Sequence, residues 1–144
     1  MIPHNSTPVP NEVFDYYLKI LSPSELKVLL VIIRQTIGWI ENKKYKKRKT
    51  TDWISHTQLV QKTGYSRKAI GQAISALTTK NLIIVTDYTR KRLHTADERQ
   101  GKLKLFYSYN LNNTPLLSCE LTSHNMRTYF TQQKKLLQKK YTLQ

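Results

Sequence analysis

The chain has 144 residues, one cysteine and a formal net charge of +15, from 24 Lys plus Arg against 9 Asp plus Glu. This length allows one domain with a hydrophobic core, and the lone Cys119 excludes an intrachain disulfide framework and fits a reducing bacterial or phage-infected cytoplasm. No apolar run approaches the ~20 residues that span a bilayer, and no signal peptide is visible. The charge therefore indicates a polyanionic partner, most commonly nucleic acid, with a membrane surface as the other candidate. We expect double-stranded DNA and no membrane.

The first part of the chain predicts an irregular arm and two helices. Residues 1–10 contain three prolines, and residues 11–21 place apolar side chains at helical spacing, namely Val13, Phe14, Tyr17, Leu18 and Leu21. Ser22-Pro23-Ser24-Glu25 is a helix-start signal, in which Ser22 caps and Glu25 closes a capping box. The second helix should run through Ile37, stop at Gly38 and lie at the centre of the core.

Residues 42–50 carry six cations in nine positions. Two interpretations stay open, a solvated loop or a loop that contacts phosphates. The cations are Lys43, Lys44, Lys46, Lys47, Arg48 and Lys49.

Residues 52–88 are ordered as short strand, helix, tight turn, helix and strand, which is typical of a winged helix-turn-helix. Ser55 or Thr57 can cap a helix that runs to about Lys62, the turn falls at Gly64, and Ser66 caps a second helix to residue 80. This second helix has one apolar stripe, formed by Ile70, Ala73, Ile74 and Leu77. Its opposite face is polar and holds Lys68, Gln72, Ser75 and Thr79.

The wing should consist of strands at 82–88 and 102–111, joined by a mobile tip at 89–101. One face of the second strand is apolar and is made of Leu103, Leu105, Tyr107, Tyr109 and Leu111. Beyond a loop, residues 122–141 carry five cations, no acid and a thin apolar stripe. This segment could be a docked helix, a helix that pairs two copies into a homodimer, or a frayed tail.

The polar face of the second helix predicts contact with double-stranded DNA, because Gln reads adenine edges and Lys reads guanine. Base or groove contacts are expected from Thr57, Ser66, Lys68, Gly71, Gln72 and Ser75, and a phosphate contact from Arg67 at the helix start. Phosphate contacts are expected from the residue 43–49 cations and from the wing-tip residues Arg90, Lys91 and Arg92. The competing interpretation is that these are ordinary solvent-facing side chains.

Catalytic and metal chemistry has no support in the sequence. The four histidines are scattered, the nine acids are dispersed, and the four glycines form no phosphate-binding loop. We therefore expect no enzyme activity, no metal and no cofactor. Trp39, Trp53 and the tyrosines are expected to fill the core and strands rather than to stack on bases.

These patterns predict an α+β, mainly α fold: a winged helix-turn-helix with a two-stranded wing and a C-terminal segment that could be helical. Residues 1–111 would form the DNA-binding domain with its N-terminal arm, and residues 112–144 a basic tail or helix.

Two strings carry a family resemblance. The first is Arg34-Gln35-Thr36-Ile37-Gly38-Trp39. The second comprises Asp52-Trp53-Ile54-Ser55, Leu59, Thr63-Gly64-Tyr65-Ser66, Ile70, Ala73-Ile74, Leu77 and Asn81-Leu82-Ile83. The chain thereby resembles the N-terminal domain of phage replication protein O, the lambda-type replisome organiser, over residues 8–88. Its spacer between Trp39 and Asp52 is longer and more basic than the family pattern.

The resemblance implies binding to repeated sites in a replication origin, followed by recruitment of a helicase or helicase loader. In the family, that recruitment uses a further C-terminal region, which the 144 residues do not contain. Two other functions stay open, a transcriptional repressor with the same fold and a protein-interaction adaptor whose positive charge meets an acidic protein.

Overall fold

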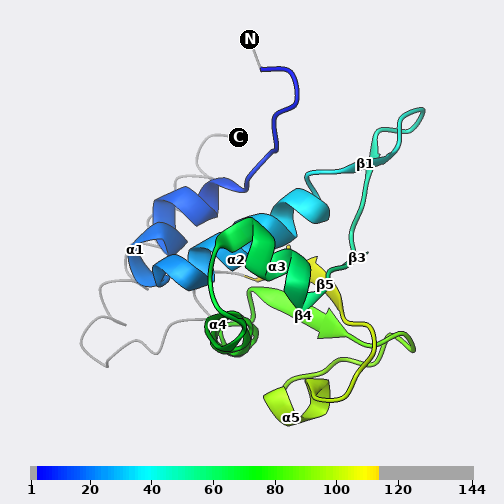
Figure 1. The fold of residues 1–144 in the computed structure, drawn as a ribbon. Helices are drawn as coiled ribbons and strands as arrows, with labels where there is room; N and C mark the ends of the chain where they lie inside the picture. The colour runs from blue at the N-terminus through cyan, green and yellow to red at the C-terminus, as the bar shows by residue number, and fades with distance from the viewer. Residues whose placement is uncertain (1–2, 114–144) are drawn as a thin grey trace, which may run out of the picture.

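The computed structural model describes residues 3–113, so the expected helix at 122–141 and its pairing lie outside the described residues. Figure 1 shows the chain order of the helices and strands. The elements are η1 (Val13–Tyr17), α1 (Leu18–Ile20), α2 (Pro23–Gln35), β1 (Ile40–Asn42), β2 (Lys47–Arg48), β3 (Asp52–Trp53), α3 (His56–Thr63), α4 (Arg67–Thr79), β4 (Ile83–Thr86), α5 (Ala96–Arg99) and β5 (Phe106–Tyr109). The fold is α+β and mainly helical, as predicted, and is compatible with a winged helix-turn-helix.

Helix α2 is the centre of the core, as predicted. It buries Val28, Leu29, Ile32 and Ile33 and packs against α3, α4 and β5. Ser22 accepts a hydrogen bond from the Glu25 backbone N–H, but the predicted capping box does not close. The Glu25 carboxylate instead lies 2.5 Å from Nζ of Lys80, which joins the start of α2 to the end of α4.

The α2 helix ends at Gln35, two residues before the predicted end. Close packing at Gly38 explains the turn that follows, because a Cβ there would lie 2.7 Å from Cγ2 of Thr7 and 2.9 Å from the Arg34 carbonyl oxygen. The Arg34 guanidinium lies 5.4 Å from the centre of the Trp39 ring. The Arg-x-Thr-x-Gly-Trp string therefore shapes the exit from α2.

Helices α3 and α4 form the predicted helix-turn-helix. Ser55 caps α3 in a complete capping box with Gln58, and Gly64 ends it with a left-handed backbone at φ 76°. Ser66 then caps α4 by accepting from the Ala69 N–H. The predicted apolar stripe of α4 is confirmed, since Ile70, Ala73, Ile74 and Leu77 are all buried.

The sheet has the antiparallel order β3-β5-β4, and the helices cover one of its faces. Val85, Tyr107 and Tyr109 point into the core beneath those helices. The predicted apolar face of the second wing strand was too long. Leu103 and Leu111 are 100% and 63% exposed, because strand β5 runs only from Phe106 to Tyr109.

The connection between the wing strands is a folded insert rather than a plain loop. Its first part turns back along β4, where the Leu93 N–H donates to the Val85 carbonyl and the Leu93 side chain is buried. It then forms α5, which begins with a capping box between Thr95 and Glu98. That four-residue signal is present in the sequence and would have located the helix.

The basic stretch at 42–50 was predicted as a loop, but most of it is a hairpin. Strands β1 and β2 pair antiparallel around a turn in which Lys46 has φ 51°. None of the helices between residues 3 and 113 is both long and apolar enough to cross a bilayer.

Candidate nucleic-acid interface

The outer face of α4 is open to solvent along the half that begins with its N-terminus. Ser66, Arg67, Lys68 and Gln72 are exposed, and Gly71 is partly exposed. A Cβ built on Gly71 would meet no atom within 4 Å. Packing inside the domain therefore does not require glycine here, although a mid-helix glycine costs about 1 kcal/mol relative to alanine.

The wing insert lies beside the same face of α4. A groove of about 580 Å³ separates α4 from α5, and Lys68, Gln72, Ser75 and Arg99 are among its lining residues. Arg99 is only 9% exposed, and Nη2 donates a 2.6 Å hydrogen bond to Oγ of Ser75. The predicted base contact at Ser75 must therefore compete with Arg99 for the same hydroxyl.

Two cations, Lys68 and Arg99, and one acid, Asp97, line the groove. Arg99 also donates to the His94 carbonyl oxygen, yet no carboxylate within residues 3–113 forms an ion pair with it. His56, the first residue of α3, lines the same groove. Burial, aided by the nearby charges of Arg67 and Arg99, lowers the pKa of His56 below its ordinary value. At neutral pH the imidazole is therefore uncharged.

Two of the predicted DNA contacts touch each other. Nη2 of Arg67 donates a 3.1 Å hydrogen bond to Oγ1 of Thr57, and both side chains are exposed. This contact joins the start of α3 to the start of α4. It leaves the remaining guanidinium N–H groups free to face a phosphate.

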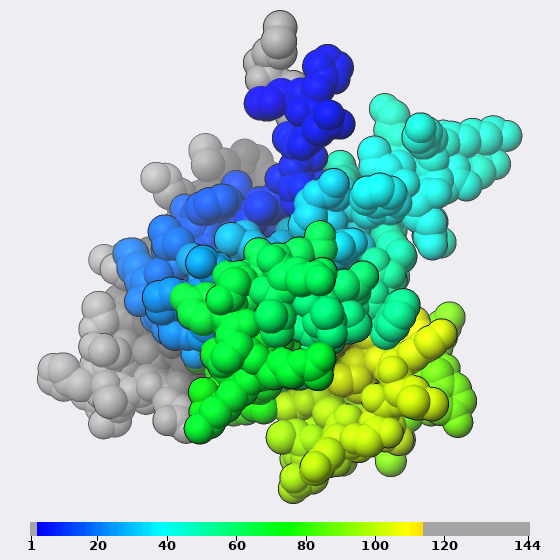
Figure 2. Space-filling model, in the orientation of Figure 1, coloured from blue at the N-terminus to red at the C-terminus, as the bar shows by residue number. Residues whose placement is uncertain are grey.

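The basic hairpin projects from the domain, as the cyan protrusion of Figure 2 shows. Five of its six predicted contact cations are exposed, namely Lys43, Lys44, Lys46, Lys47 and Arg48. Two of the six have structural roles. Arg48 donates to the Ile37 carbonyl beyond the end of α2, and Nζ of Lys49 lies 2.6 Å from Oδ1 of Asp52.

The wing-tip cations are exposed but do not form one cluster. Asp87 holds the tight turn by accepting from the Thr89 hydroxyl and from the N–H groups of Thr89 and Lys91. The hydrogen bond from the Thr89 hydroxyl is the main reason that the pKa of Asp87 lies below its ordinary value. Arg90 adopts φ 65° in this turn and lines a groove toward the hairpin, whereas Arg92 bridges to Thr86 and faces a different hollow.

The hairpin and the wing are neighbours across that groove, which has a volume of about 620 Å³. Lys47 and Lys49 line it from the hairpin side, and Tyr88 and Arg90 line it from the wing. Hairpin lysines and the wing residue Arg90, about 40 residues apart in sequence, thus share one groove.

The prediction that the aromatic residues fill the core and strands was wrong for Trp39, Tyr45 and Tyr88, which lie outside both, whereas Trp53 lies in β3 but is exposed. Tyr17, Tyr107 and Tyr109 are buried, but exposed side chains include Trp39 at 53%, Tyr45 at 72%, Trp53 at 43% and Tyr88 at 78%. Sequence alternation gave no signal for this, because Trp39 lies outside the strands and β3, which carries Trp53, has only two residues. Within residues 3–113, no group of three or more His, Cys, Asp or Glu side chains is placed to hold a metal ion.

A helix-turn-helix, a β-wing and a basic surface around them are compatible with a protein of the winged-helix class. A family model described as bacteriophage replication protein O matches residues 4–98, which is more than half of the chain. The chain therefore belongs to the bacteriophage replication protein O family, and its role is related to phage DNA replication. Comparison with curated proteins and with solved structures found no match.

Proposed function

We propose that this domain binds double-stranded DNA sequence-specifically, at sites in a phage replication origin, with α4 in the major groove. The observation that carries the proposal is the open polar face at the start of α4. Lys68 and Gln72 project there around Gly71, whose missing side chain leaves room for a close approach. Gln and Lys are the side chains that pair with adenine and guanine edges.

The proposed division of labour follows from position and charge. Lys68 and Gln72 read bases, whereas Arg67 and Thr57, which are joined by a hydrogen bond, face the backbone at the start of the helix. The exposed hairpin and wing cations contact phosphates on either side. With a net charge of +15, this electrostatic contribution makes binding strongly dependent on salt.

The family membership supports an origin rather than a promoter as the target. It also supports, as part of this proposal, recruitment of a helicase or helicase loader once the origin is bound. Binding to repeated sites would suit a homodimer, since paired half-sites mirror the symmetry of the protein.

Selection of bound sequences from random duplex DNA tests the proposal. We expect a recovered motif that occurs as repeats inside a replication gene or origin. Recovery of sites that lie over a promoter would favour a repressor instead. Failure to enrich any sequence, with weak binding to duplex DNA even at low salt, would overturn the proposal in favour of a protein-interaction role.

A further inference from the structure

The face of the sheet that points away from the helices carries an aromatic surface. In the ladder, Trp53 on β3 pairs with Phe106 on β5, and Phe106 pairs with Thr86 on β4. Directly opposed residues of antiparallel strands project from the same face. The next row, formed by Asp52, Tyr107 and Val85, projects from the other face, where Tyr107 and Val85 are buried. Trp53 and Phe106 therefore sit side by side on the outer face.

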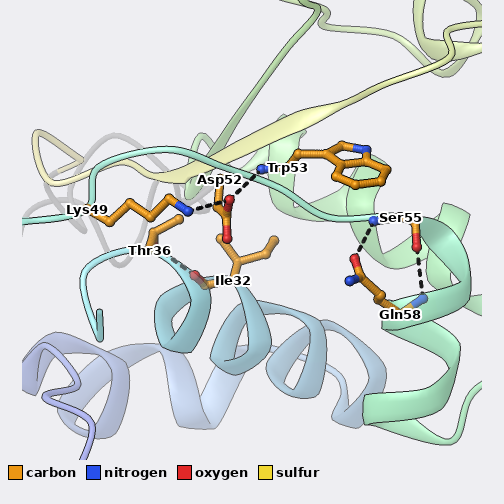
Figure 3. A network of polar contacts seen from close by, with 7 residues as sticks. All are labelled: Ile32, Thr36, Lys49, Asp52, Trp53, Ser55 and Gln58. Carbon is orange, nitrogen blue, oxygen red and sulfur yellow. Dashed lines mark hydrogen bonds and ion pairs between the residues drawn. The ribbon is translucent and has the colours of Figure 1, made fainter. Parts of the chain in front are cut away.

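Figure 3 shows the same alternation at β3, where the Asp52 carboxylate lies between the strand and α2 while the Trp53 indole points away. The indole is 43% exposed and Phe106 is partly exposed. Lys104 precedes Phe106 by two residues, and its Nζ lies 5.3 Å from the centre of the Trp53 ring. A cation thus accompanies the aromatic pair.

More charge and a third aromatic ring lie at one edge of this surface. Phe106 also lines the groove between hairpin and wing, together with Tyr88, Lys47 and Arg90. Lys47 and Arg90 are exposed and belong to no ion pair of the described residues. Of the two acids that line the groove, Asp87 is buried and held by Thr89, Lys91 and Lys102, which leaves Glu41 as the exposed one.

We propose that this aromatic surface, formed by Trp53, Phe106, Lys104 and Tyr88, binds single-stranded DNA. Bases would stack on Trp53 and Phe106, and Lys104 would hold the phosphates. Lys47 and Arg90, at the edge that this surface shares with the hairpin and wing, would contact the phosphates of either DNA. Exposed aromatic rings beside a positively charged groove are how proteins bind single strands without strong sequence preference, because every base has a flat face that can stack. In a duplex the bases already stack on each other, so their faces are not available to stack on the rings of this surface.

This site goes beyond the duplex-binding function. The aromatic surface and the helices lie on opposite faces of the sheet, so α4 stays available to a duplex while a single strand occupies the outer face. One domain could then hold a duplex site and a strand released by local melting beside it. The positive charge of the groove favours a polyanionic ligand over a neutral peptide.

The two tryptophans of the chain give a direct test, since each can be studied alone. In the Trp39→Phe protein, the only indole is Trp53, and an oligo(dT) of about 12 nucleotides should quench its fluorescence. In the matched Trp53→Phe protein, the only indole is Trp39, which is similarly exposed, and its emission should change little. Quenching of Trp39 alone, or of neither indole, would overturn the proposal.

Affinity measurements separate this site from the duplex site. The Kd for oligo(dT) should rise about tenfold or more in Trp53→Ala, and in Trp53→Leu if the alanine protein folds poorly, but less than about twofold in Trp39→Ala. The Kd for duplex DNA should stay within about twofold of wild type in both Trp53 variants. An equal loss of affinity for single-stranded and duplex DNA would contradict a separate site. Tighter binding of oligo(rU) than of oligo(dT) would contradict single-stranded DNA as the ligand of this surface. Retained duplex specificity with no oligo(dT) binding would sink this inference and leave the proposed function intact.

Discussion

Arg99 and Ser75 join the wing insert to the middle of α4. Nη2 of Arg99 donates a 2.6 Å hydrogen bond to the Ser75 hydroxyl, and Arg99 is 91% buried by its surroundings. A buried guanidinium without a carboxylate depends on such hydrogen bonds. The contact therefore decides how close α5 lies to the face of α4 that is proposed to enter DNA.

A double-mutant cycle with Ser75→Ala and Arg99→Met measures this contact. The coupling free energy in urea unfolding should be about 1–2 kcal/mol, as for hydrogen bonds to charged groups. The control cycle pairs Ser75→Ala with Arg92→Met, an exposed arginine of the same insert, and should give a coupling near zero. Equal couplings in the two cycles would mean that water replaces the bond at no cost.

Gln72→Ala should weaken binding to the selected DNA site by about 1–3 kcal/mol and binding to random duplex DNA very little, because the lost contact is to a base edge. Competition titrations with the two DNAs measure both numbers. Gln61→Ala, which removes an exposed glutamine from α3 instead, is the matched control and should leave both affinities unchanged. Equal losses on the two DNAs would assign Gln72 to phosphate contact.

Gly71→Ala should stabilise the protein and impair DNA binding at the same time. The free energy of unfolding should rise by about 0.5–1 kcal/mol, since alanine favours the helix and the new Cβ meets no atom within 4 Å. The Kd for the selected site should rise, because the same Cβ now separates the helix from the groove. By contrast, Gly64→Ala should lower stability because Gly64 has φ 76°. Unchanged DNA affinity in the stabilised Gly71→Ala protein would show that α4 does not approach DNA at this position.

The hairpin prediction concerns salt. Changing Lys43 and Lys46 to Gln should flatten the slope of log K against log salt by about 2 units if both contact phosphates. The control changes Lys19 and Lys27 to Gln, two exposed lysines of the N-terminal helices, and alters the net charge equally. The control slope should remain close to that of the wild type. Identical slopes in the two double variants would mean that the hairpin is solvated in the complex.

Two buried tyrosines should respond to loss of the hydroxyl with opposite signs. The Tyr107 hydroxyl is buried without a hydrogen-bond partner among the described residues, so Tyr107→Phe should raise the free energy of unfolding by about 1 kcal/mol. The Tyr109 hydroxyl donates to the Glu12 carboxylate, so Tyr109→Phe should lower it by about as much. Urea titrations of both variants test the pair, and a destabilised Tyr107→Phe protein would mean that the hydroxyl does have a partner.

Tyr107 also makes the free energy of unfolding depend on pH. Burial raises the pKa of Tyr107 from 10.0 to about 12. Between these values the unfolded chain has lost the proton and the folded protein keeps it, so stability falls as pH rises. The Tyr107→Phe protein should lose less stability over this range than wild type does.

The sequence by itself determined the local features, those that depend on residues only a few positions apart in the chain. The buried stripe of α4, the caps at Ser22, Ser55 and Ser66, and the turn at Gly64 all follow from the preferences of neighbouring residues. Even the missed α5 had a local signal in Thr95 and Glu98. The matching strings predicted the family for a similar reason, since their residues lie within two short stretches of the chain, 34–39 and 52–83.

Only the tertiary structure decided which distant residues meet. Strand register places Trp53 beside Phe106, and the path of the insert brings Arg99 to Ser75, although 53 and 24 residues separate these pairs in sequence. The hairpin from Ile40 to Arg48 was also hidden, because its strands are two and three residues long and exposed throughout, so they show no alternation. Pairing of this kind depends on the packing of the whole domain, which a local pattern does not contain.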